Sequence, residues 1–206
     1  MSNFHEKNIR AYDKKAGHYN DTFDGKFTEK FKALLLANMD IKENDSVLDV
    51  GCGNGTLLSK LAEAKAISGF GIDISLQMIE NAKLRYPEFQ FAVSSCEKMP
   101  FPDNMMDTIT VCAAFHHFPD VNAFASEAKR LIKQGGSLYI AEVCFPPLIR
   151  HIANVFLPLS KEGDVKFYSP KEIERIFSRV GFRLVNVIKQ GHIQIMRLQI
   201  PFGGNP

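Results

Sequence analysis

The sequence has no tryptophan, and its four cysteines include no Cys-x-x-Cys pair. Zinc ribbons and disulfide frameworks need such pairs or a cysteine-dense chain, so both are disfavoured. We therefore expect Cys52, Cys96, Cys112 and Cys144 to be reduced and partly buried, and we predict no metal site. The sequence also lacks an apolar run of about 18 residues and the apolar centre of a signal peptide. These absences predict a cytoplasmic protein without membrane insertion.

The charge balance is nearly even, with 25 Lys and Arg against 23 Asp and Glu and a formal net charge of +2. Nucleic-acid binding depends on a broad basic field, so the balance disfavours a nucleic-acid partner. With 206 residues, 45% of them hydrophobic, the chain suits one globular core. We predict a single domain over residues 1–206, and these features give no prediction of the oligomeric state.

Strand-like and helical patterns alternate along most of the chain, which predicts an α/β fold with a doubly wound parallel sheet. Two further strand-like runs lie near the end of the sequence, joined through Gln190-Gly191, and indicate a hairpin. The expected strands cover 46–50, 69–73, 89–93, 107–113, 137–142, Phe182 to Ile188 and His192 to Ile200.

The most informative stretch runs from Val47 to Gly55, where a buried strand is predicted to enter a loop with glycine at alternate positions. A Rossmann dinucleotide site carries Gly-x-Gly-x-x-Gly/Ala here and an acid about 20 residues further on. Asp73 matches that acid, but Thr56 replaces the last small residue, and Asp49 would repel a diphosphate. S-adenosylmethionine (SAM) has no phosphate and brings an ammonium and a sulfonium, so Asp49 favours SAM over a nicotinamide cofactor.

The motifs D-V-G-C-G-N-G and G-F-G-I-D-I-S resemble the first two motifs of class I SAM-dependent methyltransferases. Further segments, such as Phe115 to Asp120 and Arg130 to Gly136, are most similar to the small-molecule methyltransferases of ubiquinone and menaquinone biosynthesis. The resemblance implies a doubly wound, Rossmann-like, seven-stranded sheet, mostly parallel with a C-terminal antiparallel hairpin strand. It also implies SAM as the cofactor.

Pattern and resemblance together indicate a set of cofactor-binding residues. Asp73 is expected to accept bonds from the ribose hydroxyls, although it could instead cap the next helix. Asp49 could be a buried acid bonded to loop amides, the glycines a purely structural turn, and Met78 a core residue. Family members usually have Asp where this chain has Ser95, so adenine binding is either weaker or assisted by Glu97. The full set is Tyr19, Asp49, Gly51, Cys52, Gly53, Asp73, Ile74, Met78, Ser95, Cys96, Glu97, Cys112, Ala113 and Phe115.

Two segments outside the alternating pattern are lid candidates. Residues 1–40 resemble the family's N-terminal helices, which fold over the cofactor, and residues 144–168 form an apolar, proline-punctuated insertion after the fifth strand. The bland alternative is that their apolar side chains simply cover the sheet.

Methyl transfer needs an aligned acceptor and exclusion of water, with a base only where the acceptor must lose a proton. The available groups are His116, His117, Glu142 and His151; each is more readily explained as structural, and His117 is expected to cap or pack against the following helix. We therefore assign no catalytic residue. The leading hypothesis is methyl transfer to a small apolar or aromatic acceptor, and the alternative is a non-catalytic protein that binds SAM or its demethylated product as a sensor or partner.

Overall fold

The computed structural model describes residues 3–202, so the ends of the predicted domain, residues 1–2 and 203–206, lie outside the described residues. Seven strands form one sheet in the order β3-β2-β1-β4-β5-β7-β6. All neighbours are parallel except that β7 runs antiparallel to both β5 and β6, which confirms the predicted fold. The strands are β1 (Ser46–Val50), β2 (Ser68–Asp73), β3 (Gln90–Val93), β4 (Met106–Cys112), β5 (Ile132–Val143), β6 (Arg183–Gln190) and β7 (Ile193–Gln199).

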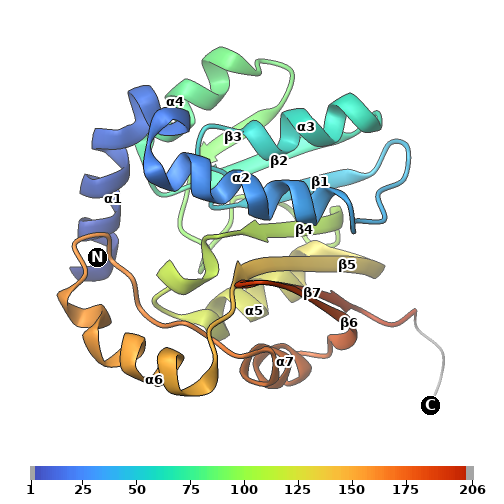
Figure 1. Cartoon of the computed structure of the whole chain (residues 1–206). Helices are drawn as coiled ribbons and strands as arrows, with labels where there is room; N and C mark the ends of the chain where they lie inside the picture. Colours follow the sequence, from blue (N-terminus) through green and yellow to red (C-terminus); the bar gives the residue numbers. More distant parts are fainter. Residues whose placement is uncertain (1–2, 203–206) are drawn as a thin grey trace.

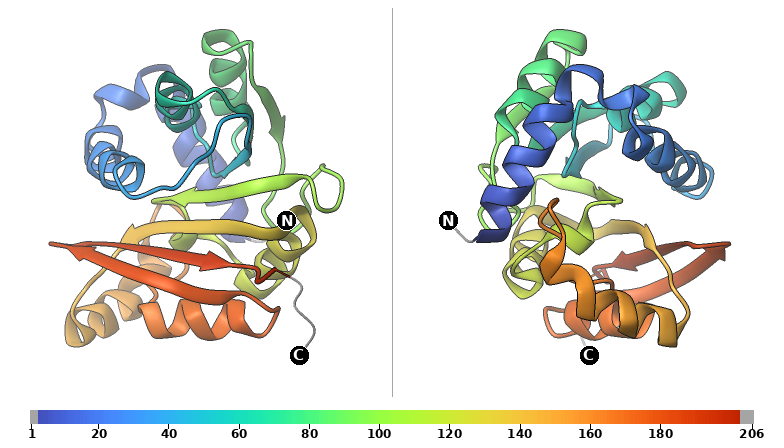
Figure 2. Two further views of the ribbon diagram at one scale, coloured as in Figure 1. Left: turned by 90° about the vertical axis from the view of Figure 1, so that its right-hand side faces the viewer. Right: turned by 60° about the vertical axis from the view of Figure 1, so that its left-hand side comes forward.

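Helices cover both faces of the sheet (Figure 1). Alternation along β1 explains the two cores: Val47 packs in one cluster with Phe31 and Leu57, and Leu48 packs in the other with Phe124. The view at the left of Figure 2 separates these layers on opposite sides of the central strands. The helices are α1 (Asn3–Lys15), η1 (Ala16–Asp21), α2 (Phe23–Leu36), α3 (Thr56–Ala64), α4 (Leu76–Arg85), η2 (Phe115–His117), α5 (Val121–Leu131), α6 (Pro147–Phe156), η3 (Leu157–Leu159) and α7 (Pro170–Ser178).

The strand order reverses between β1 and β4, which marks the crevice where open α/β sheets bind ligands. Helix α1 lies at this carboxyl edge, between α4 and the segment that follows α6 (Figures 1 and 2). Its Asp13 accepts a 2.5 Å hydrogen bond from Ser75 at the start of α4, and its Asn8 donates a 3.1 Å bond to the carbonyl of Glu162. The N-terminal helix is therefore attached on both sides of the crevice.

Local signals fixed several boundaries. Ser169 and Glu172 form the expected capping box at the start of α7, which ends before Gly181. β5 begins at Ile132, earlier than the expected residue 137, because Ile132 pairs with Met106 across a register shift in β4. Among residues 3–202, no helix is both long enough and apolar enough to cross a membrane.

Candidate functional site

A cleft opens at the carboxyl edge of the sheet, under α1. The loops after β1, β2, β3 and β4 all reach it, so residues far apart in sequence meet there. Of the expected cofactor residues, ten line this cleft: Tyr19, Gly51, Gly53, Asp73, Ile74, Met78, Ser95, Cys96, Cys112 and Ala113.

The glycine loop needs left-handed backbone at each of its glycines, with φ of 74°, 52° and 80° at Gly51, Gly53 and Gly55. A Cβ at Gly55 would lie 2.8 Å from the Phe91 ring, so this glycine permits close packing of loop and strand. A Cβ at Gly53 would meet nothing within 4 Å, because this part of the backbone faces open space. Gly53 is therefore where a ligand can approach the chain.

Asp73 ends β2 and holds the loop in place. Its Oδ2 accepts a 2.8 Å bond from the Gly53 amide, and its Oδ1 accepts a 2.9 Å bond from the Ser75 amide. Burial raises the pKa of Asp73, although these backbone hydrogen bonds oppose the shift. Ser75, not Asp73, is the N-cap of α4, so the alternative role for Asp73 is wrong. A carboxylate has about four acceptor positions, which leaves capacity for ligand hydroxyls.

Asp49 lies in a second, smaller chamber, which shares Gly51 and Gly53 with the cleft. Its side chain points to the α2 side of β1. There it accepts a 2.8 Å hydrogen bond from Thr110 and interacts electrostatically with Lys32. It is 2% exposed, and burial raises its pKa to about 6 despite these two groups. Cys52 lines the same chamber. Sequence reasoning missed Lys32, because nothing along α2 signals which of its polar residues turns inward.

The residues expected around the adenine do not all lie in the cleft. Met78 and Ile74 line the cleft, and Met78 is also buried in α4; a role for either residue in cofactor binding stays a prediction. Ser95 lines the cleft as well. Glu97 lies outside both chambers and pairs with His5 at 3.5 Å.

Phe115 does not lie where the sequence placed it. The side chain is fully buried in the core, with ring contacts to Phe124, Tyr168 and Phe177, and it lines neither chamber. The short helix η2 turns it away from the crevice because the following layer, α5 and α7, offers it an apolar site. Ala113 instead reaches the cleft, with an unusual φ of 52° for a non-glycine residue.

Each histidine of η2 has one hydrogen-bond partner that the other does not share. Nδ1 of His116 lies 2.8 Å from Oε2 of the fully buried Glu142 on β5. Burial alone would lower the pKa of His116, but the charge and hydrogen bond of Glu142 outweigh it and raise that pKa. His117 bonds through Nε2 to the Tyr12 hydroxyl at 3.0 Å, and burial lowers its pKa well below the usual range. The expected helix-capping role of His117 is wrong, since Asp120 caps α5.

The segment 144–168 lies beside the crevice without lining it among the described residues. Phe145 and Phe167 are partly buried against the core, whereas Phe156 is 61% exposed on α6. His151 is exposed on the same helix. The role of this segment as a lid stays a prediction.

All four cysteines are free, as expected.

The crevice, the glycine loop and the acids at the ends of the neighbouring strands β1 and β2 define a nucleotide-type site on a Rossmann-like sheet. Residues 48–140 match a family model described as a methyltransferase domain. The demethylmenaquinone methyltransferase of Paenarthrobacter aurescens is 30% identical over 140 residues, which are 67% of this chain and 55% of that protein. The ubiquinone/menaquinone biosynthesis C-methyltransferase UbiE of Rickettsia akari is 33% identical over 110 residues, 48% of this chain and 44% of that protein.

Solved structures support the same fold. One chain from the complex between the Haloferax volcanii Trm112 methyltransferase activator and a methyltransferase has a TM-score of 0.81 at 21% identity, covering 92% of this chain and 97% of that one. The chain therefore carries a domain of the class I SAM-dependent methyltransferases, and SAM is the cofactor of this class. It spans about half the length of the curated relatives it matches.

Proposed function

We propose that the protein binds SAM in the joined chambers and transfers its methyl group to a small apolar or aromatic acceptor. The observation that carries the proposal is the glycine loop between two acids, with the partly buried Asp73 on one side and the buried Asp49 on the other. A buried carboxylate with a raised pKa is stabilised by a cation, and SAM offers cationic groups where a dinucleotide offers phosphates.

The residues present fit the cofactor at each end. Asp73 would hold the ribose, with Ile74, Met78, Ser95 and Cys96 around the base. Asp49 would hold the ammonium, and Lys32, which lines the same chamber, would hold the carboxylate. The bound cofactor supplies a methyl group already activated by the sulfonium. The task of the chain is then to align the acceptor and exclude water.

The acceptor side of the cleft is lined largely by apolar and weakly polar side chains from the loop after β4, including Ala113, Ala114 and Phe118. Such a wall favours an uncharged ring over a charged acceptor. The names of the curated relatives, demethylmenaquinone methyltransferase and ubiquinone/menaquinone biosynthesis C-methyltransferase, support quinols as the first compounds to try. A small-molecule acceptor and a cytoplasmic location stay predictions.

The test has two arms on the purified protein. Calorimetry with SAM, S-adenosylhomocysteine and NAD should show binding of the first two and none of the third. Turnover is then measured by mass spectrometry against demethylated quinols, simple phenols and amines. Binding without turnover of any acceptor would favour the sensor hypothesis, and failure to bind SAM would contradict the proposal altogether.

A further inference from the structure

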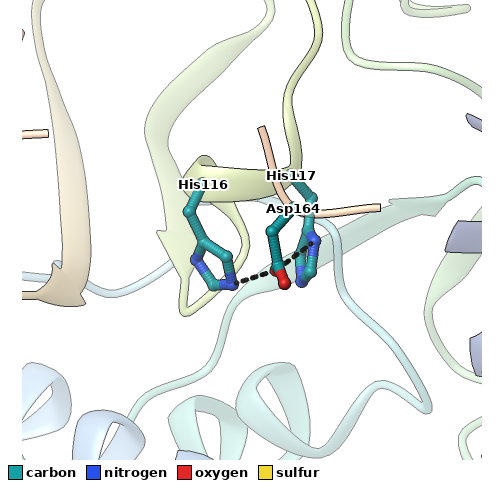
Figure 3. A group of neighbouring side chains, drawn as sticks. All are labelled: His116, His117 and Asp164. Atoms are coloured by element: carbon teal, nitrogen blue, oxygen red, sulfur yellow. Dashed lines mark ion pairs between the residues drawn. The ribbon is translucent and has the colours of Figure 1, made fainter. Parts of the chain in front are cut away.

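Three side chains that the proposed methyl transfer does not use converge beside the cleft. His116 and His117 come from η2 after β4, and Asp164 comes from the segment that follows α6 (Figure 3). Asp164 contacts both imidazole rings, whose centroids lie 4.0 Å apart, with its Oδ1 3.5 Å from Nε2 of His116 and 3.2 Å from Nδ1 of His117. One ligand atom from each residue lies within 4.8 Å of the other two. This is the spacing of a metal-binding group.

Each member of the cluster also forms a hydrogen bond to a different residue outside the cluster. Glu142 bonds Nδ1 of His116 at 2.8 Å, and Tyr12 bonds Nε2 of His117 at 3.0 Å. The Ser160 hydroxyl donates to Oδ2 of Asp164. Metal-ligating histidines characteristically use their second nitrogen in this way, often with a carboxylate. The outer contacts therefore leave Nε2 of His116, Nδ1 of His117 and Oδ1 of Asp164 as the atoms that approach one another.

The distances suit a four-coordinate ion. In a tetrahedral zinc site with bonds of about 2.0–2.1 Å, neighbouring ligand atoms lie about 3.3–3.4 Å apart. The two separations from Oδ1 of Asp164, 3.2 Å and 3.5 Å, fall on either side of that value, and all the ligand atoms lie within 4.8 Å of one another. Two imidazole nitrogens and one carboxylate oxygen are also a donor set that zinc accepts in sites with an open fourth position.

One contact of the cluster is incomplete. Nδ1 of His117 is buried and lies 3.2 Å from Oδ1 of Asp164, but it makes no well-aligned hydrogen bond to any residue in the range 3–202. The side chain is only 10% exposed, so solvent does not readily compensate. Negative charge also gathers here, since Asp164 and Glu142 flank the rings and Glu162 lies nearby, opposed by Lys15. A cation at the convergence point would satisfy both the nitrogen and the excess charge.

We propose that His116, His117 and Asp164 bind one divalent transition-metal ion, with zinc as the best match, although the sequence alone predicted no metal site. His117 and Tyr12 line the cleft, so the ion lies in its wall. If the proposed methyl transfer is correct, the open position can bind an oxygen of the acceptor and favour its deprotonated form. The competing explanation is a proton on His116 shared with its two carboxylates.

The test uses tag-free, chelator-treated full-length protein titrated with Zn²⁺, Co²⁺ and, as a control, Mg²⁺. We expect one equivalent of Zn²⁺ by calorimetry, little Mg²⁺ binding, and the intense visible absorption of four-coordinate Co²⁺. His117→Gln and Asp164→Asn should each weaken Zn²⁺ binding by more than tenfold, and Glu142→Gln by about 10–100-fold. His151→Gln, an exposed histidine on α6, should leave binding unchanged.

Wild-type protein that takes up no equivalent of Zn²⁺, or whose Co²⁺ spectrum is that of the hydrated ion, would overturn the proposal and leave a proton-bound network. Identical titrations of the wild type and the Asp164→Asn variant would do the same. The wild-type Co²⁺ spectrum gives this answer even where a variant fails to fold. SAM affinity of the metal-free protein is measured on the same sample, so that failure of the metal site is distinguished from failure of the proposed function.

Discussion

Asp49 should destabilise the cofactor-free protein when it ionises. Its pKa rises from an ordinary value of 3.8 to about 6 on folding because the side chain is buried. The stabilisation that comes from protonated Asp49 is therefore fully present below pH 3.8 and is lost as the pH rises through about 6. The shift corresponds to about 3 kcal/mol in total, of which about 1.4 kcal/mol falls between pH 5 and pH 8.

The Asp49→Asn variant isolates this effect, because asparagine keeps an oxygen for the bond from Thr110 but does not ionise. Urea unfolding of both cofactor-free proteins at pH 5 and pH 8 gives two free-energy differences. Subtracting one from the other cancels pH-independent costs of the amide as well as the titration of other groups. Between pH 5 and pH 8, the free energy of unfolding of the variant should rise by about 1.4 kcal/mol relative to that of the wild type.

SAM binding should show the opposite preference, since the ammonium needs the ionised carboxylate. Wild-type affinity for SAM should rise about tenfold between pH 5 and pH 7, whereas the variant should bind more weakly with a much flatter profile. Calorimetry at several pH values measures both. Two results together would refute this account of Asp49. The difference in unfolding free energy between the variant and the wild type would be the same at pH 5 and pH 8, and the two proteins would bind SAM with equal affinity.

Three further variants test individual positions. Asp73→Ala removes charge-assisted bonds of about 1.5–3 kcal/mol each, so SAM affinity should fall at least tenfold by calorimetry; an unchanged dissociation constant in a folded variant would remove the ribose assignment. Ser95→Asp should tighten SAM binding several-fold, and equal or weaker binding at unchanged thermal stability would show that the adenine amine is already satisfied. Phe156→Ala should change the free energy of unfolding by less than about 0.5 kcal/mol because the ring is 61% exposed, while raising the acceptor Michaelis constant if α6 belongs to a lid. A loss of about 3–5 kcal/mol with unaltered selectivity would place Phe156 in the core instead.

The sequence by itself determined the elements and the order in which they are joined. Strand and helix periods, the capping box at Ser169 and the turn at Gly191 depend on the backbone preferences of neighbouring residues, so they are legible without tertiary contacts. The glycine loop and Asp73 were predictable for the same reason. Their geometry is set by positive φ values and by the end of one strand.

Only the tertiary structure decided which side chains meet. Phe115 turned into the core because α7 lies beneath it, and Lys32 came to line the chamber of Asp49 because α2 packs on that face of β1. Asp164 pairs with His116, although one of these residues follows β5 in the sequence and the other precedes it. No local pattern in either segment carries information about the other. Side-chain neighbours across the fold follow from packing, which depends on the whole chain at once.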